Sequence, residues 1–197
     1  MAITAPVTTL EWIATALGVA CVILVVRRSL WNYPLAIGSV TLFGIVFRDA
    51  KLYSDALLQV FFVVINLYGW WNWARARGEQ GAVVVETMTL LAQVGTLGGM
   101  IGLTLGWGAV MATQTDAAYP YIDAAVAMLS VGAQVMLARR KLENWIVWIV
   151  VDLIAVPLYA AKGLWAAAGL YVIYLGLSVW GLIDWHRAWR GGGRLAA

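Results

Sequence analysis

An aspartate, Asp152, stands in an otherwise apolar stretch, ENWIVWIVVDLIAVPLY, which covers residues 143–159. Trp145, Trp148 and Asp152 are spaced i, i+3 and i+7, which places them on one face of a helix, and Tyr159 follows two turns later. A carboxylate inside an apolar span is costly and usually serves a binding site. Because an indole face attracts a cation, this helix face is suited to a small, planar, positively charged ligand.

Two other apolar runs carry polar or aromatic groups at matching positions. Gln59 and Asn66 are seven residues apart, and Tyr171 and Ser178 have the same spacing in a later run, with Tyr174 in between. Amide side chains can bond a carboxamide or a hydroxyl group of a ligand. The candidate substrate-binding residues are Trp145, Trp148, Asp152, Gln59, Asn66, Tyr159, Tyr171, Tyr174 and Ser178.

Each candidate also has a purely structural interpretation. Trp145 could belong to an interfacial belt of tryptophans. Gln59 and Asn66 could bond a neighbouring helix, and Asp152 could do the same. These alternatives stay open at the level of the sequence.

The elements that position these groups are predicted to lie in a lipid bilayer. Of 197 residues, 63% are hydrophobic and 12% charged, whereas a soluble domain is about 45–50% apolar and about 25% charged. We predict an all-α integral membrane protein with seven transmembrane helices. The predicted spans are roughly Leu10–Val26, Tyr33–Phe47, Leu52–Trp73, Thr89–Ala112, Tyr121–Ala138, Trp145–Ala161 and Leu164–Trp185.

Lysine and arginine are divided unevenly between the two sides of these spans. The connections on one side hold ten, and those on the other side hold three. By the positive-inside rule, the N-terminus is outside and the C-terminus is cytoplasmic. The net charge of +3 is then a topology signal and not a sign of nucleic-acid binding.

An internal repeat relates the two halves of the chain. RRSLWN at residues 27–32 falls on RRKLEN at residues 139–144, and the same offset extends the match along three spans without a gap. Gln59 and Asn66 then fall on Tyr171 and Ser178. The first-half counterpart of Asp152 is Val40, so the shared fold does not require the aspartate. This asymmetry favours a binding role for Asp152.

The repeat predicts one membrane domain over residues 1–197 with a 3+1+3 plan. A single helix between two three-helix units makes the units parallel, and such units bind substrate between the halves near the bilayer midplane. The predicted parts are a first repeat over 10–73, a linker helix over 89–112, a second repeat over 121–185 and a cytoplasmic tail over 186–197.

The linker helix contains a run of small residues, GTLGGMIGLTLGWG. Gly95 and Gly99 are four residues apart, and so are Gly98, Gly102 and Gly106. Small residues at this spacing let helices approach closely. The sequence leaves open whether this face packs on its own bundle or against another subunit.

Motifs for catalysis or for binding a cofactor or metal are missing from the sequence. It has no phosphate-binding glycine loop and no zinc-protease motif, and Cys21 and His186 are each the only residue of their type. Passive transport without a cofactor is the simplest interpretation. Two alternatives are a membrane enzyme that pairs Asp123 with Asp152, and a receptor subunit that binds without transporting.

Two blocks resemble the PnuC family of bacterial vitamin transporters. They are YPLAIGSVTLFGIVFRDAKLYSDALLQVFFVVINLYGWWNW and DAAYPYIDAAVAMLSVGAQVMLARRKLENWIVWIVVD. The resemblance implies a homotrimer in the bacterial plasma membrane, each subunit similar in plan to SWEET sugar transporters. It implies import of nicotinamide riboside by facilitated diffusion for pyridine nucleotide biosynthesis, followed by trapping through cytoplasmic phosphorylation.

The chain departs from this family at one position. Nicotinamide riboside transporters of the family typically carry Trp-x-x-Trp-x-x-x-Asn, and this sequence has Asp152 at the last place. That variant resembles members proposed to carry thiamine. Both vitamins are cationic aromatics, so we expect nicotinamide riboside as the substrate, with thiamine as the alternative.

Overall fold

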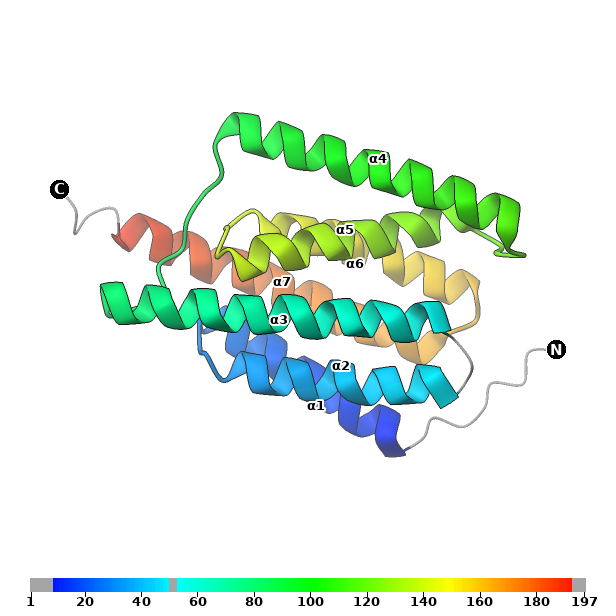
Figure 1. The fold of residues 1–197 in the computed structure, drawn as a ribbon, viewed down its shortest axis with the longest axis horizontal. Helices are drawn as coiled ribbons and strands as arrows, with labels where there is room; N and C mark the ends of the chain where they lie inside the picture. Colours follow the sequence, from blue (N-terminus) through cyan, green and yellow to red (C-terminus); the bar gives the residue numbers. More distant parts are fainter. Residues whose placement is uncertain (1–8, 50–52, 193–197) are drawn as a thin grey trace.

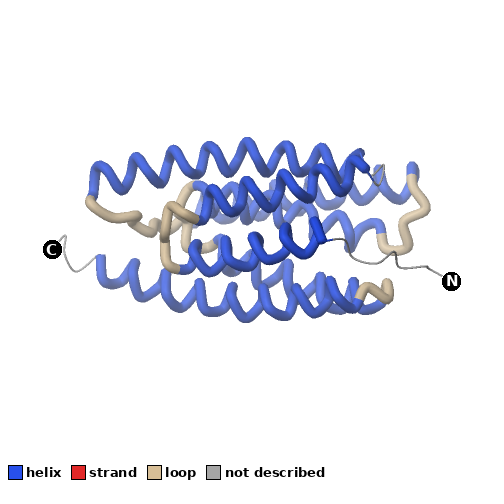
Figure 2. Tube along the Cα trace, turned by 90° about the horizontal axis from the view of Figure 1, so that it is seen from below, coloured by secondary structure: helices blue, strands red, loops and turns tan. Residues whose placement is uncertain are grey.

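The computed structural model describes residues 9–49 and 53–192, and all of the secondary structure in these ranges is helical apart from one isolated bridge. The helices lie side by side along one long axis (Figures 1 and 2). They are α1 Thr9–Val26, α2 Asn32–Asp49, α3 Tyr53–Gln80, α4 Leu90–Gln114, α5 Pro120–Ala138, α6 Asn144–Ala161 and α7 Trp165–Gly192.

Five of these helices are long and apolar enough to span a bilayer by length and composition alone, namely α1, α4, α5, α6 and α7. The sequence predicted seven spans. Helix α2 ends in Arg48 and Asp49, and α3 ends in a polar, charged stretch, which lowers their average hydropathy. Both helices nevertheless run alongside the other five in the same bundle (Figure 1).

Helices α3 and α7 run well beyond the predicted ends of their spans. Each has 28 residues, so most of the predicted tail over 186–197 is the last part of α7. The extension of α3 is rich in helix-forming residues, and Arg75 and Glu79 form an ion pair of 2.8 Å one turn apart on it. The two longest helices are thus equivalent members of the two repeats.

Six helices close into a ring, and the seventh lies outside it. Contacts run from α1 to α2, α3, α5, α6, α7 and back to α1, whereas α4 packs only on α5 among the described residues. Helices α1 and α5 run in the same direction (Figure 1). The two three-helix units are therefore parallel, and they meet at two seams, α3 with α5 and α7 with α1.

Hydrogen bonds at one end of the ring follow the sequence repeat. The Trp73 indole N–H donates to the carbonyl of Leu137 at 3.1 Å, and that of Trp185 donates to the carbonyl of Val25 at 3.2 Å. Each bond crosses one seam. The pairing of equivalent residues in both seams shows a near-twofold axis running along the bundle.

The turns at this end are also equivalent. Arg28 and Arg140 both adopt left-handed backbone angles, with φ of 54° and 59°, a conformation that costs energy for a residue other than glycine. In the next turn, Asn32 and Asn144 donate to the carbonyls of Ser29 and Lys141. The two Arg-Arg motifs of the repeat thus build the same helix-reversing turn.

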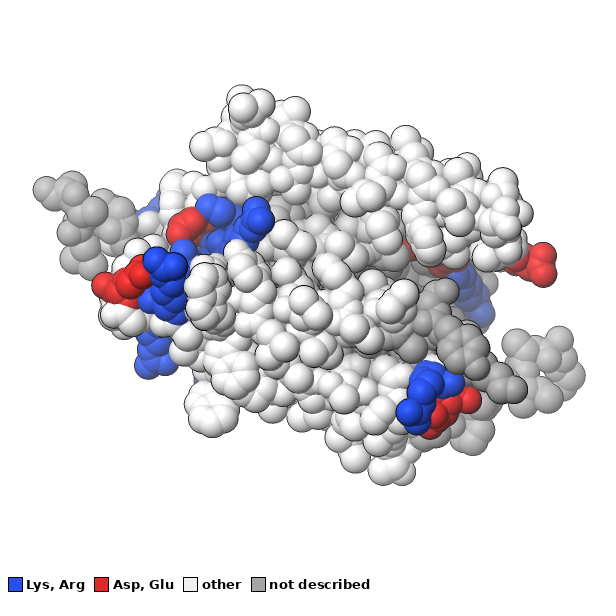
Figure 3. Space-filling view, in the orientation of Figure 1, with Lys and Arg blue, Asp and Glu red and all other residues white. Residues whose placement is uncertain are grey.

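On the face seen in Figure 3, charged side chains gather at the two ends of the molecule and leave a band without them in between. The end that carries the C-terminus holds the Arg-Arg turns and the charged end of α3. The opposite end holds Arg48 on α2 and the Lys162–Asp123 ion pair of 2.5 Å. This separation is the arrangement expected of a bundle that crosses a bilayer.

Candidate functional site

Asp152 on α6 is buried and bonded to the neighbouring helix α7. Its side chain is 1% exposed, and its Oδ2 accepts a hydrogen bond of 3.0 Å from the hydroxyl of Ser178, which is also buried. Among the described residues no ion pair joins Asp152 to a basic side chain. The bundle therefore holds a carboxylate in an apolar setting with a single hydroxyl as its hydrogen-bond donor.

Three tyrosines form a row next to this carboxylate on the same two helices. Tyr159 of α6 stacks on Tyr171 of α7 with ring centroids 5.1 Å apart, and Tyr171 meets Tyr174 edge-to-face at 5.9 Å. Tyr174 lies one turn from Ser178 on α7. The row thus continues the Asp152–Ser178 pair along the seam between α6 and α7 and offers flat faces and hydroxyls.

The two tryptophans of α6 lie in different surroundings. Trp148 is half-buried and packs on two apolar clusters, one of which includes Tyr159 and Tyr171. Trp145 is 2% exposed and meets Trp185 edge-to-face at 5.5 Å at the end with the Arg-Arg turns. Trp148 therefore lies one turn from Asp152 and packs on both clusters, whereas Trp145 belongs to the end of the ring.

The amides of α3 contact two other helices, α5 and α2. Asn66 is buried, and its Oδ1 accepts a bond of 3.1 Å from Gln134 of α5, across the α3–α5 seam. The Gln59 side chain lies against Gly44 of α2. Contacts thus join Asp152 to Ser178 and the three tyrosines to one another, while Asn66 contacts α5, Gln59 contacts α2 and Trp145 contacts α7.

Sequence reasoning did not select several residues that contact the predicted ones. Gln134 bonds Asn66, and a polar residue inside an apolar span was the available signal. Tyr33 is the repeat counterpart of Trp145, and both lie against a glycine of the third helix of their unit, Gly69 and Gly181. The internal repeat was therefore the signal for Tyr33.

Gly18 of α1 is another contact that spacing did not reveal. A Cβ atom at this position would lie 2.9 Å from the Tyr174 hydroxyl and 3.3 Å from the Ser39 hydroxyl. Ser39 is itself fixed by a bond of 2.7 Å to the carbonyl of Ala14. The missing side chain at Gly18 thus makes the room that the Tyr174 hydroxyl occupies.

Pro157 lies on the outer face of α6 and not on the Asp152 face. It lines a shallow apolar groove with Leu153 and Tyr119, and Leu153 is 56% exposed. Because Pro157 has no backbone N–H, the carbonyl group four positions earlier lacks its helical hydrogen-bond partner. That residue, Leu153, is on the outward side, away from the buried carboxylate.

The described residues contain no group of three or more His, Cys, Asp or Glu side chains that could hold a metal ion. Asp123, which an enzyme would have to pair with Asp152, is instead bonded to Lys162 at the far end of α5. The chemistry available at the site is therefore recognition by one carboxylate, aromatic faces and hydroxyls.

Comparisons with known proteins agree with this architecture. Residues 8–187 match the family described as nicotinamide mononucleotide transporter. The chain is 29% identical to the nicotinamide riboside transporter PnuC of Escherichia coli (strain K12), over 95% of this chain and 89% of that protein. It is 31% identical to the riboflavin/roseoflavin transporter RibM of Streptomyces davaonensis, over 89% of this chain and 83% of that protein.

A solved structure has the same fold. The crystal structure of the vitamin B3 transporter PnuC superposes with a TM-score of 0.74 at 26% sequence identity, and the match covers 92% of this chain and 82% of that one. The similarity therefore extends over nearly all of the ring and the extra helix.

Proposed function

This chain belongs to the nicotinamide mononucleotide transporter family, and on that premise we propose that it imports nicotinamide riboside by facilitated diffusion. It is a multi-pass membrane transporter and not an enzyme. The observation that carries the substrate proposal is the near full-length similarity to a relative named for nicotinamide riboside. The Asp152 carboxylate and the tyrosine row support it, because a pyridinium ring is flat and cationic.

Thiamine is the second candidate, because of the same carboxylate. A buried carboxylate attracts a ligand with a full positive charge. A neutral amide at position 152 could form a hydrogen bond with the ligand but would lack this charge attraction. Thiamine carries such a charge on its thiazolium ring. The similarity to a riboflavin transporter adds a neutral vitamin that the same experiment should include.

A binding titration with purified protein tests the choice of substrate. Nicotinamide riboside, thiamine, riboflavin and the phosphorylated form of each are titrated in detergent. We expect nicotinamide riboside to bind most tightly and its phosphorylated form to bind poorly, because the phosphate brings negative charge towards Asp152. Tighter binding of thiamine or riboflavin would replace nicotinamide riboside as the substrate.

The passive mechanism and the direction of import belong to the same proposal. The basic end of the ring is assigned to the cytoplasm, so that the N-terminus is outside and phosphorylation inside the cell traps the imported vitamin. Uptake into proteoliposomes should need no ion gradient, and external ligand should exchange with internal ligand. Uptake that a protonophore abolishes in intact vesicles would contradict the passive mechanism.

We further propose that the protein is a homotrimer that assembles through α4. Gly95, Gly98, Gly99, Gly102 and Gly106 each have no atom near the position of a Cβ. This face therefore points away from the subunit's own bundle, and α4 instead packs on α5 through other residues, including Met100. A second copy of the chain is the partner that close helix packing through glycines would fit.

A further inference from the structure

The segment between α3 and α4, residues 81–89, crosses the end of the ring that carries the C-terminus (Figure 1). We call it the α3–α4 linker. Val83 and Val85 are buried, at 8% and 5% exposure, while Val84 between them is 39% exposed. This alternation is that of an extended strand with one face on a core, so the linker is packed and not a loose tether.

The buried valines complete the apolar cluster at this end of the ring. The cluster contains residues of α1, α2, α3, α5, α6 and α7, among them Trp73, Trp145 and Trp185. The Trp73 and Trp185 rings lie 5.7 Å apart, and these two residues are repeat equivalents. The linker therefore covers the place where the two halves of the ring meet.

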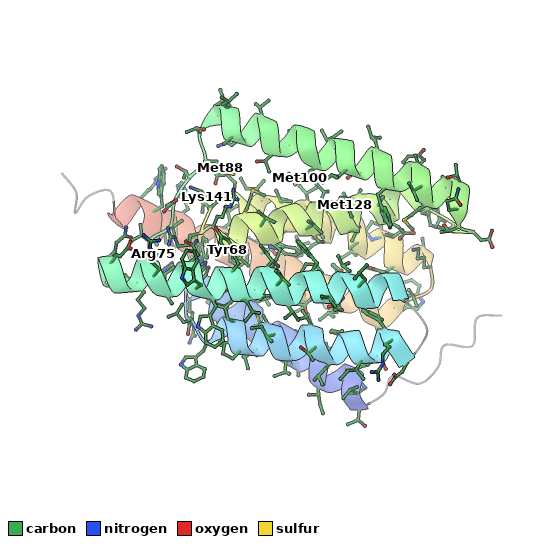
Figure 4. The ribbon with its side chains drawn as sticks, viewed as in Figure 1. Tyr68, Arg75, Met88, Met100, Met128 and Lys141 are labelled. Carbon is green, nitrogen blue, oxygen red and sulfur yellow. The ribbon has the colours of Figure 1, made fainter. Side chains whose placement is uncertain are left out.

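Backbone bonds and ion pairs hold the linker to the turn between α5 and α6. The Glu86 N–H donates to the carbonyl of Arg140 at 3.0 Å, and the Leu142 N–H donates to the carbonyl of Glu86 at 2.8 Å. The Glu86 carboxylate pairs with Arg140 at 2.6 Å and with Lys141 at 2.7 Å. Lys141 and Met88, from the two sides of this contact, lie near each other in Figure 4.

A further bond fixes the far end of the linker. Glu143 Oε1 accepts from the Met88 N–H at 2.8 Å and from Gln93 of α4 at 3.2 Å. In the first repeat, Arg28 pairs with Asp184 of α7 at 2.6 Å, which matches the bond of 3.1 Å from Arg140 to the carbonyl of Asn72. Arg140 differs in that it also pairs with Glu86 of the linker. The linker thus contacts the Arg-Arg turn of the second repeat only. It breaks the near-twofold symmetry at the end of the ring that carries the C-terminus.

We propose that the α3–α4 linker is the cytoplasmic seal of the transport pathway. In this conformation Val83 and Val85 close the ring, and the linker detaches from the α5–α6 turn when ligand leaves towards the cytoplasm. Detachment breaks the Glu86 bridge, its ion pairs and the Glu143–Met88 bond, and it exposes Val83 and Val85, while every helix stays intact. The choice of ligand and the orientation rest on the function proposed above.

Trp145 connects the seal to the candidate site. It packs in the same cluster as the linker valines, and it stands two turns before Asp152 on α6. A shift of the linker removes packing from one end of the helix whose middle carries the carboxylate. The seal and the site are therefore joined by a single rigid element.

A reversible disulfide across the bridge tests the seal. Glu86→Cys and Lys141→Cys are combined in a Cys21→Ser background, because bridged residues lie within the Cα separation that a disulfide needs. Oxidation should reduce nicotinamide riboside uptake into proteoliposomes more than tenfold, and reductant should restore it. Binding of nicotinamide riboside in detergent should survive oxidation.

The matched control is the pair Arg75→Cys and Glu79→Cys, which lies one turn apart on the exposed end of α3 and is oxidised in the same way. Its uptake should not change. The seal is wrong if the oxidised Glu86–Lys141 pair transports as fast as the reduced protein, or if it loses binding together with uptake.

Hydrogen exchange separates a failure of the seal from a failure of the proposed substrate. If the reduced protein takes up no nicotinamide riboside, the substrate proposal fails and the seal is tested without ligand. The amides of Glu86 and Leu142 should then exchange faster than those in the middle of α6, and the disulfide should slow them. Equal exchange of both sets would overturn the seal.

Discussion

The carboxylate of Asp152 is the group that we propose to decide which ligands the site accepts. The hydrogen bond from the Ser178 hydroxyl offsets part of the free-energy cost of burying this carboxylate. A buried charge without a counterion is nevertheless unfavourable. A cationic ligand would supply the missing opposite charge. The free protein thus carries a cost at this residue that binding of the proposed ligand would relieve.

Replacement of Asp152 with asparagine separates binding from stability. We expect Asp152→Asn to weaken binding of thiamine at least tenfold, which corresponds to about 1.4 kcal/mol, and to weaken binding of nicotinamide riboside less, because the pattern typical of nicotinamide riboside transporters has asparagine at this place. The melting temperature should stay the same or rise, because the change removes a buried charge but keeps the shape and an acceptor for Ser178. Isothermal calorimetry and thermal unfolding in detergent measure the two effects.

The opposite pattern would assign Asp152 to the scaffold. If the melting temperature fell sharply while the affinity persisted, the carboxylate would be a structural link between α6 and α7. Binding of riboflavin, if it occurs, serves as the comparison ligand, because a neutral vitamin should be much less sensitive to the loss of the charge.

Gly18 of α1 should help to position the tyrosine row on the neighbouring helix α7. Gly18→Ala places a methyl group where the Tyr174 hydroxyl lies, and Ser39 cannot yield easily because it is bonded to Ala14. Tyr174 must therefore shift against Tyr171. We expect a loss of nicotinamide riboside affinity of about fivefold or more, or about 1 kcal/mol, measured by titration.

Gly176→Ala is the matched control for Gly18→Ala. Gly176 is also inside a helix, two residues from Tyr174, but nothing lies near the position of its Cβ. The added methyl should leave affinity unchanged and should stabilise α7 by up to about 1 kcal/mol. Equal affinity in both variants would show that Tyr174 does not depend on Gly18.

Spacing on a helix predicted some neighbours of the site and not others. Asp152, Trp148 and Tyr159 share a face of one helix, which is a local property that periodicity reveals. The pairing of Asn66 with Gln134 joins residues 68 positions apart, and it depends on which helices are adjacent in the ring. No local pattern carries that information, so this bond across the α3–α5 seam could not be read from the sequence.

At the scale of the elements, the α3–α4 linker was the part least visible in the sequence. The stretch AVVVETMT lies between two predicted spans and reads as a short connection. Its packing depends on Glu86 meeting Arg140 and Lys141, which belong to a turn on the far side of two intervening helices in the chain. The helices themselves are predictable, because apolar runs and charged ends are local signals, although the spans predicted from the sequence stop short of the polar ends of α3 and α7.

The linker should make stability depend on pH in the acidic range. Burial raises the pKa of the Glu86 carboxyl, but hydrogen bonds and charges from Lys141 and Arg140 outweigh it and hold the pKa below its ordinary value of 4.5. A carboxyl with a lowered pKa contributes stability above the unfolded value, and this contribution is lost as pH falls through the lower, folded value. The ion pairs should therefore weaken below about pH 4.5.

Glu86→Gln isolates this contribution. The melting temperature of the variant should be lower than that of the unchanged protein at pH 7, and the difference should shrink as the pH falls from 4.5 towards 3. Glu79→Gln alters an exposed pair at the same end and should show a smaller difference. A gap for Glu86→Gln that stayed constant with pH would show that its charge does not hold the linker.

At the scale of the whole molecule, the repeat is what organises the ring. The offset that lays Arg27 on Arg139 could be read from the sequence, and the structure pairs the same positions in both seams, Trp73 with Leu137 and Trp185 with Val25. Departures from the repeat mark what is particular to each half. Asp152 stands where the first half has Val40, and the linker is joined to the turn of the second half alone.

The glycine face of α4 is the surface through which the subunits should assemble. Gly98→Leu and Gly102→Leu each place a large side chain where close approach of a second helix would need none. We expect either variant to convert the homotrimer into monomers, while binding of nicotinamide riboside to each subunit persists, because α4 lies outside the ring. Native mass spectrometry and light scattering in detergent measure the mass of the assembly.

The control for this change is Gly169→Leu on α7. Gly169 also has open space at its Cβ position, but it lies on a helix of the ring and not on α4. The trimer should survive this substitution.

Met100 lies on the face of α4 that packs on the subunit's own bundle, because it is buried against Gly132 of α5, between the two helices in Figure 4. Met100→Ala should therefore loosen α4 from its own bundle. If Gly169→Leu abolished the trimer and Gly98→Leu retained it, the interface would lie on α7 and not on α4.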